Sequence, residues 1–213
     1  LKDFLAWALV VIMIFQGCAR FEPTPMPSVE PRDFPYGISK NGVEVRMATF
    51  TPGEVETYFA SNLTRKNVWP MRVSIDNKSQ STYLFAKGYA GPHQISSHEA
   101  ARKGRRKAGW RLAWGLIFWA TFFGIPIAIP LFVTGCQALG ANSYMETEYK
   151  NWEIADRELA PGDAVSGILF FQSPNPPPRI EFGLMDAAAT EEHLELTVDL
   201  SRPFGAMPSE AEK

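Results

Sequence analysis

Hydrophobic and polar residues alternate in the first half of the chain in a way that predicts β-strands. Residues 41–50 (NGVEVRMATF) place valine and methionine at alternate positions, the period of a strand with one buried face. Residues 69–77 (WPMRVSIDN) alternate in the same way, and residues 82–86 (TYLFA) are rich in strand-forming side chains. Because the polar residues 76–81 lie between these two strands, we expect a β-hairpin over residues 69–90.

The second half of the chain contains three further strand patterns. Residues 164–171 (AVSGILFF) are apolar enough for a central strand, and the prolines of residues 173–178 (SPNPPP) end it. Residues 180–185 and 193–200 follow as a strand pair. Each half supplies only about three strands, which is marginal for burying a core. The two halves together are therefore expected to form one two-sheet sandwich.

One short helix is predicted after the first strand. Thr51 is a favourable N-cap, Pro52 is tolerated in a first helical turn, and Glu54 stands three residues after Thr51, as in a capping box. The helix is expected to present an apolar side to the core and to end near residue 62.

The N-terminal segment has the pattern of an export signal. Residues 4–15 (FLAWALVVIMIF) are uncharged, and twelve residues are too few for a helix to cross a bilayer, which needs roughly 20. This length matches the apolar region of a signal peptide. With residues 15–18 (FQGC), the segment resembles the signal peptide and lipobox of bacterial lipoproteins. The resemblance implies that residues 1–17 are removed and that Cys18 carries the acyl chains, palmitate among them. A buried apolar helix with an incidental cysteine is the alternative.

The residues after the cysteine are consistent with a tether. Five prolines fall within residues 23–35, so residues 18–38 are expected to form an extended, Pro-rich linker. The lipoprotein resemblance also bears on location, because Ala19 replaces the aspartate that retains enteric lipoproteins in the inner membrane. We therefore expect a lipid-anchored protein of the bacterial cell envelope, on the periplasmic side of the outer membrane rather than at the inner membrane.

A second resemblance concerns the sandwich. Residues 76–84 contain an N-x-S turn, and residues 159–171 (LAPGDAVSGILFF) fit the pattern L-x-P-G-x-x-V-x-G-x-L-x-F. These motifs are similar to those of small immunoglobulin-like sandwiches in secreted bacterial proteins. The resemblance implies a mainly β chain with an immunoglobulin-like β-sandwich, and it implies no activity. The domain parts are then residues 39–100 and 142–204, separated by an insertion over residues 101–141 and followed by a disordered tail over residues 205–213.

The insertion is apolar and interrupted. Residues 112–133 are 22 residues without a charge, long enough to cross a bilayer as a straight helix. Gly124, Pro126 and Pro130 argue against a straight helix, because each proline removes a backbone donor and clashes with the preceding turn. The pattern therefore predicts a helical hairpin that enters one leaflet and returns to the same side.

Charge gives a separate argument for the hairpin. Residues 101–141 carry six basic and no acidic residues, whereas residues 142–213 carry five basic and fourteen acidic residues. If Cys18 is lipidated, a single crossing would place the acidic half in the cytoplasm, against the positive-inside tendency, and would divide the sandwich.

Basic and tryptophan side chains beside the apolar segment are the candidate membrane contacts. Basic residues attract anionic headgroups, and tryptophan favours the membrane interface. A buried helical hairpin packed on the sandwich or a partner, with the basic run as a solvated edge, is the alternative. The candidate contact residues are Arg102, Lys103, Arg105, Arg106, Lys107, Trp110, Arg111, Trp114 and Trp119.

Composition excludes several other classes of function. A net charge of −2 argues against a nucleic-acid binder that works by bulk charge. His93 and His98 lack metal-ligand spacing, and no nucleophile elbow, phosphate-binding loop or dinucleotide fingerprint occurs. No catalytic residue, cofactor, metal site or small-molecule substrate is therefore expected.

Two functions fit these features. The first is a non-enzymatic, membrane-anchored lipoprotein whose sandwich is a binding or structural module, with membrane lipid and an envelope protein as its partners. The alternative is a subunit of a membrane protein complex, held by packing of the apolar hairpin on partner helices.

Overall fold

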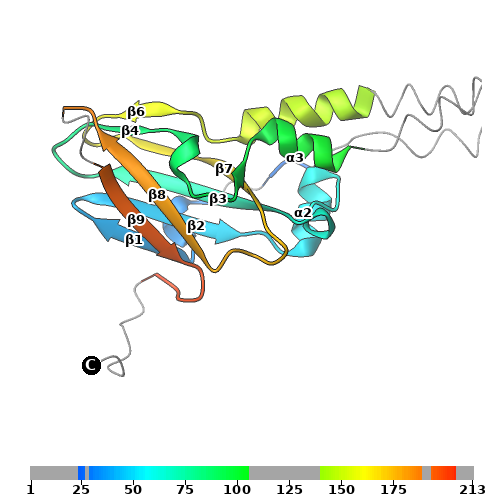
Figure 1. Ribbon diagram of the computed structural model, residues 1–213, viewed down its shortest axis with the longest axis horizontal. Helices are drawn as coiled ribbons and strands as arrows, with labels where there is room; N and C mark the ends of the chain where they lie inside the picture. Colours follow the sequence, from blue (N-terminus) through cyan, green and yellow to red (C-terminus); the bar gives the residue numbers. More distant parts are fainter. Residues whose placement is uncertain (1–23, 27–28, 106–139, 189–192, 205–213) are drawn as a thin grey trace, which may run out of the picture.

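The computed structural model describes residues 24–26, 29–105, 140–188 and 193–204, and within them the chain is mainly β (Figure 1). The strands are β1 (Tyr36–Lys40), β2 (Val43–Thr49), β3 (Val68–Asn77), β4 (Tyr83–Phe85), β5 (Gln94–Ile95), β6 (Arg157–Leu159), β7 (Ala164–Gln172), β8 (Arg179–Asp186) and β9 (His193–Asp199). The helices are α2 (Pro52–Phe59), α3 (Ser97–Gly104), one over residues 140–152, and the 3-10 turns η1 (Pro31–Asp33), η2 (Thr64–Lys66) and η3 (Lys87–Tyr89).

The strands form two antiparallel sheets that pack face to face. The order is β1-β2-β3-β7-β5 in the five-stranded sheet and β6-β4-β8-β9 in the four-stranded sheet. Strands from both halves of the sequence occur in each sheet, because β7 lies between β3 and β5 while β6 pairs with β4. The prediction that the two halves build one sandwich agrees with this arrangement.

A hydrophobic core fills the space between the sheets. The alternating residues that the sequence placed on one face, such as Val43, Val45 and Met47 of β2, are fully buried there. Leu194, Leu196 and Val198 of β9 close the core from the other sheet. The period-2 pattern therefore identified the buried faces of β2, β3 and β9 correctly.

The predicted hairpin over residues 69–90 is wrong. β3 belongs to the five-stranded sheet and β4 to the four-stranded sheet, so the chain changes sheets between them. Asn77 holds this corner, because its buried side-chain Nδ2 donates to the backbone oxygens of Ser81 and Leu159, at 2.8 and 2.9 Å. Its Oδ1 accepts a hydrogen bond from Ser79 Oγ at 2.6 Å. The polar segment is thus a bridge across the edge of the sandwich, not a turn within one sheet.

The helix α2 was predicted, whereas several other short elements were not. α2 forms with the predicted capping box, in which Thr51 and Glu54 cap each other. The strands β1, β5 and β6, the helix α3 and the helix over residues 140–152 were not predicted. β1 begins at Tyr36, within the segment expected to be a tether, and pairs with β2 along its whole length.

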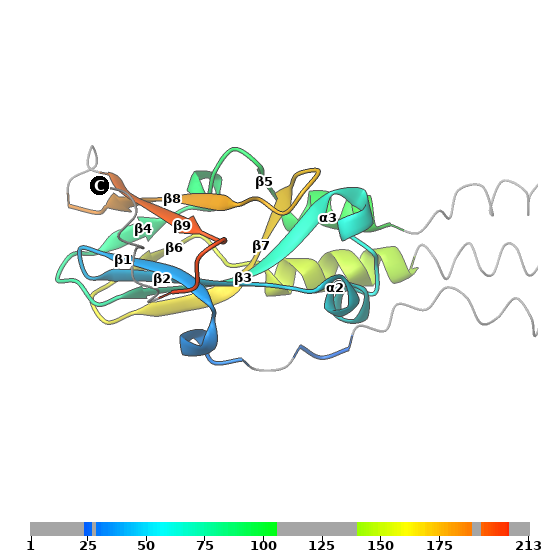
Figure 2. The same ribbon diagram turned by 90° about the horizontal axis from the view of Figure 1, so that it is seen from below.

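β7 is apolar because both of its faces are covered. Leu169 and Phe171 point into the core between the sheets, whereas Ile168 and Phe170 pack into a second apolar cluster under α2, α3 and the helix over residues 140–152. Tyr149, from that helix, stacks on Phe170 with 5.6 Å between ring centroids. Figure 2 shows the helices gathered at one end of the sandwich, with β7 reaching towards them.

The tyrosine at the centre of this second cluster is fully buried. Its hydroxyl donates to the backbone oxygen of Phe59 at 2.9 Å, and burial raises the pKa of Tyr149 well above its usual range. The hydroxyl is therefore a permanent hydrogen-bond donor, and it ties the helix over residues 140–152 to the end of α2.

Gly167 of β7 lies directly against the chain that leaves the last helix. A Cβ at this position would come within 2.7 Å of the Ile154 backbone. We expect Gly167→Ala to lower the free energy of unfolding of the purified full chain by about 1–3 kcal/mol in denaturant titrations. Gly53 of α2 has no atom within 4 Å of an added Cβ, so Gly53→Ala is expected to stabilise by up to about 1 kcal/mol. Equal effects of the two substitutions would contradict this account.

Candidate functional site at the helical end

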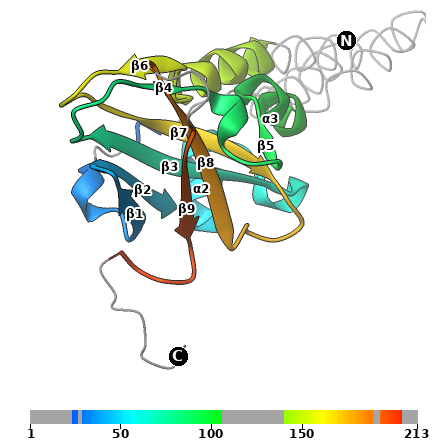
Figure 3. The same cartoon turned by 60° about the vertical axis from the view of Figure 1, so that its left-hand side comes forward.

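The two helices that border residues 106–139 lie side by side at one end of the sandwich (Figure 3). α3 ends at Gly104, and the helix over residues 140–152 begins the next described segment. Arg105 and Asn142 line one surface groove, so the two described ends that flank residues 106–139 are neighbours. We call this region, formed by α2, α3 and the helix over residues 140–152, the helical end.

A carboxylate joins the two bordering helices. Glu146 accepts from His98 Nδ1 of α3 at 2.7 Å and from Arg105 Nη2 at 3.0 Å. The hydrogen bond from His98 has the largest effect on the pKa of Glu146, and the hydrogen bond from Arg105 has the next largest. Both hold this pKa below its usual value. Glu146 is therefore ionised at neutral pH, Arg105 compensates its charge, and His98 adds a second hydrogen bond.

The end of α3 is held by a close approach and by hydrogen bonds. A Cβ on Gly104 would lie 3.2 Å from the sulfur of Met145, so the absence of a side chain lets the helices pack tightly here. The Gly104 carbonyl accepts from Ser61 Oγ at 3.1 Å and from Lys66 Nζ at 3.2 Å. The last carbonyl of α3 is thus satisfied before the chain leaves the described residues.

A buried carboxylate fixes the opposite ends of the same helices. Glu153 follows the helix over residues 140–152, and its side chain is 6% exposed. It accepts from the backbone nitrogen and the hydroxyl of Ser97, at 3.0 and 2.8 Å, at the first turn of α3. Lys87 Nζ lies 3.1 Å from the same carboxylate. Negative charge is stabilised at a helix N-terminus, so Glu153 clamps α3, η3 and β7 together.

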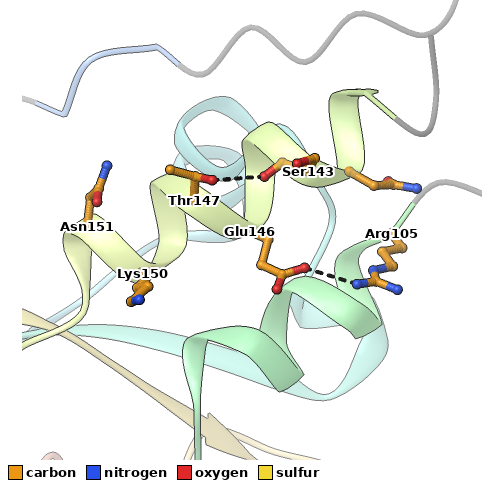
Figure 4. A pocket seen from close by; sticks show the side chains of 7 residues that line it. Arg105, Ser143, Glu146, Thr147, Lys150 and Asn151 are labelled. Carbon is orange, nitrogen blue, oxygen red and sulfur yellow. Dashed lines mark hydrogen bonds and ion pairs between the residues drawn. The ribbon is translucent and has the colours of Figure 1, made fainter. Parts of the chain in front are cut away.

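An open groove of about 610 Å³ lies between Arg105 and one face of the helix over residues 140–152 (Figure 4). Among the described residues, two cations line it, Arg105 and Lys150, together with one acidic residue, Glu146. The remaining lining side chains are neutral hydrogen-bonding groups, namely Asn142, Ser143, Thr147 and Asn151. Such a groove can bind an anion, because its donors outnumber its acceptors and Glu146 is already paired.

The structure places three of the predicted membrane contacts at the helical end. Arg102 and Lys103 lie on α3, 3.7 and 3.9 Å from Glu99, and Arg105 follows them. The side chain of Arg102 remains 63% exposed, so its long ion pair is weak. The other predicted residues lie outside the described part of the chain: Cys18, Arg106, Lys107, Trp110, Arg111, Trp114 and Trp119.

Sequence reasoning missed the residues contributed by the helix over residues 140–152. Ala141, Met145 and Tyr149 are buried at intervals of four residues, which is a helical period. This period was readable in the sequence, and with it the polar face that carries Glu146 and Lys150.

Two absences apply to the described residues. Within them, no group of three or more histidine, cysteine, aspartate and glutamate side chains is arranged to hold a metal ion. Among the helices of residues 24–26, 29–105, 140–188 and 193–204, none has both the length and the hydrophobicity needed to cross a membrane.

Comparison with known proteins gives no relatives: no protein-family model, curated sequence or solved structure matches this chain. The functional argument therefore rests on the geometry of the helical end.

Removing the carboxylate of Glu153 is expected to loosen the helical end. Glu153→Ala leaves the Ser97 N–H and the Lys87 ammonium without their partner, and we expect a loss of about 2–3 kcal/mol in the free energy of unfolding. Glu56→Ala, at an exposed position of α2, is the control and should change stability by less than about 0.5 kcal/mol. Denaturant titrations of both full-chain variants test this, and a neutral Glu153→Ala would show that the clamp adds no stability.

Proposed function

We propose that the protein is a non-enzymatic, membrane-anchored lipoprotein of the bacterial cell envelope. In this proposal its sandwich is a binding or structural module, held at the membrane surface by acyl chains on Cys18 and by the apolar segment within residues 106–139. One observation carries the proposal: described residues close to the two segments that the sequence assigns to the membrane, namely Met26, Arg105 and Asn142, all lie at the helical end.

The first part of this observation concerns the residues on either side of the insertion. Arg105 and Asn142 line one groove, and strands from before and after the insertion interleave in both sheets. The sandwich parts therefore lie on one side of any membrane, and the insertion must return to the side from which it starts. A stretch of 22 uncharged residues is long enough for one crossing but not for two. This supports a hairpin that enters one leaflet.

The second part of this observation concerns the N-terminal segment. Met26 packs against the apolar cluster at the helical end. Cys18 is eight residues earlier, a distance of at most about 28 Å in a fully extended chain. An acyl anchor on Cys18 would thus reach the bilayer beside the insertion. One acyl signal binds a membrane reversibly and two signals give stable anchoring, so the two elements complement each other.

The immunoglobulin-like type of the sandwich is part of the proposal. In that fold the strands follow the orders A-B-E-D and C-F-G in the two sheets. The orders β2-β3-β7-β5 and β4-β8-β9 match these if β1 is an additional edge strand before strand A and if the insertion and β6 fall between strands D and E. This agreement supports a common surface-exposed scaffold whose function resides in its attachments and loops.

Lipidation is tested with Cys18→Ala in cells grown with labelled palmitate. We expect label in the wild type and none in the variant, because the thiol is the acyl acceptor. Cys136→Ser is the matched control and should retain the label. Absence of label from the wild type would contradict the lipoprotein part of the proposal.

The sidedness of the insertion is tested by labelling with a membrane-impermeant maleimide. In a Cys136→Ser background, single cysteines replace the exposed residues Glu56 and Glu158, which precede and follow the insertion. Spheroplasts are expected to label both positions before lysis. Labelling of only one position would indicate a single crossing and a spanning subunit. Retention of Cys18→Ala in carbonate-washed membranes reports whether the insertion enters the bilayer by itself.

A further inference from the structure

We propose that the groove at the helical end binds the phosphodiester headgroup of an anionic membrane lipid. This inference rests on the proposed function, which puts the helical end at the bilayer. It adds a specific ligand site to a general membrane contact, and apart from Arg105 it depends on residues that the sequence argument did not name.

The chemistry of the groove favours an anion. Lys150 is exposed and has no hydrogen bond or ion pair among the described residues. Arg105 gives one of its five N–H groups to Glu146 and keeps the rest for other acceptors. Each carboxylate oxygen of Glu146 accepts one hydrogen bond from the protein itself, Oε1 from His98 and Oε2 from Arg105. Arg105 and Lys150 thus offer N–H donors at two places along the groove, and Arg105 compensates the charge of the neighbouring Glu146.

The arrangement of the groove suits a headgroup that enters from the membrane. In Figure 4, Ser143 and Thr147 lie along one side of the helix, whereas Glu146 and Lys150 lie along the side nearer α3. From Ser143 to Lys150 the helix rises about 10 Å, so a ligand entering near the start of the described helix passes a hydroxyl before it reaches the ammonium. The flexible stem of Lys150 lets its charge extend towards the headgroup layer.

An exposed aromatic residue on the same helix is consistent with a membrane surface at the helical end. Tyr144 follows Ser143 and is 70% exposed, and it is the exposed large hydrophobic side chain among the described residues. Tyrosine side chains of this kind are enriched at the membrane interface, where the ring contacts apolar chains and the hydroxyl contacts water or headgroups. Tyr144 is not among the residues that line the groove, so it is a separate candidate contact with the membrane interface.

The lining also argues against two other ligands. None of the described residues that line the groove is aromatic, so they offer no stacking platform for a base. None of these described residues has an apolar side chain that could hold the anchor of a docked peptide. A small, hydrated anion is the ligand class that these side chains recognise.

The test measures which lipid stays with the protein. The full chain is reconstituted with equal amounts of phosphatidylglycerol and phosphatidylethanolamine, extracted in mild detergent, and its bound lipids are quantified by mass spectrometry. We expect wild type to retain phosphatidylglycerol in excess and Lys150→Gln to lower that excess about fivefold, the effect of one charge near an anionic surface. Arg157→Gln, an equal charge loss at an exposed position of β6 that does not line the groove, should leave it unchanged.

Three outcomes overturn the headgroup site. The first is that the wild type retains no excess of phosphatidylglycerol. The second is that Lys150→Gln and Arg157→Gln lower the phosphatidylglycerol excess equally. The third is that Lys150→Gln changes the unfolding midpoint enough to account for its lower phosphatidylglycerol excess. A second arm titrates inorganic phosphate and follows the Lys150 amide by NMR in the wild-type protein. Phosphate binding without phosphatidylglycerol enrichment would assign the groove to free phosphate instead of lipid.

The carbonate wash and the acyl label test the proposed function separately from the groove. A protein that leaves membranes in a carbonate wash and takes up no acyl label refutes the anchoring. A protein that remains in washed membranes without enriching phosphatidylglycerol refutes only the groove.

Discussion

The burial of β7 on both faces is the constraint on which the rest of the structure depends. One face, through Leu169 and Phe171, completes the core between the sheets. The other face, through Ile168 and Phe170, would expose two large apolar side chains if the helices were absent. Burying such a side chain contributes about 1.5–3 kcal/mol. The helices that border the insertion are therefore part of the fold of the sandwich itself.

This dependence explains why so many polar contacts converge on two short helices. α3 has eight residues, and isolated helices of this length are unstable in water. Its N-terminal turn is completed by Glu153 and its C-terminal carbonyl by Ser61 and Lys66. Tertiary contacts at both ends thus compensate for the length that α3 lacks. The cost is that the helical end has little freedom to rearrange around its groove.

The sequence predicted those elements whose pattern is local. The long strands β2, β3, β7, β8 and β9 follow from alternation or apolar density, and α2 follows from its capping box. The assignment of strands to sheets did not follow, because the corner at Asn77 depends on a hydrogen bond to Leu159, 82 residues away. β5 and β6 have two and three residues, too few to show a period. Of the candidate site, Arg105 was found from charge clustering, whereas Glu146 and Lys150 belong to a helix whose period was overlooked beside the apolar segment.

The adjacency of Arg105 and Asn142 has a consequence for how such a chain can change over evolution. Residues 106–139 join two points that the fold already holds together, so this segment can be shortened, exchanged or duplicated without moving a strand. Loop-closure entropy adds only about 0.6 kcal/mol for each doubling in length, a small change beside the packing around β7. The junction between Arg105 and Asn142 is therefore a position at which the sandwich tolerates inserted segments of different length and sequence.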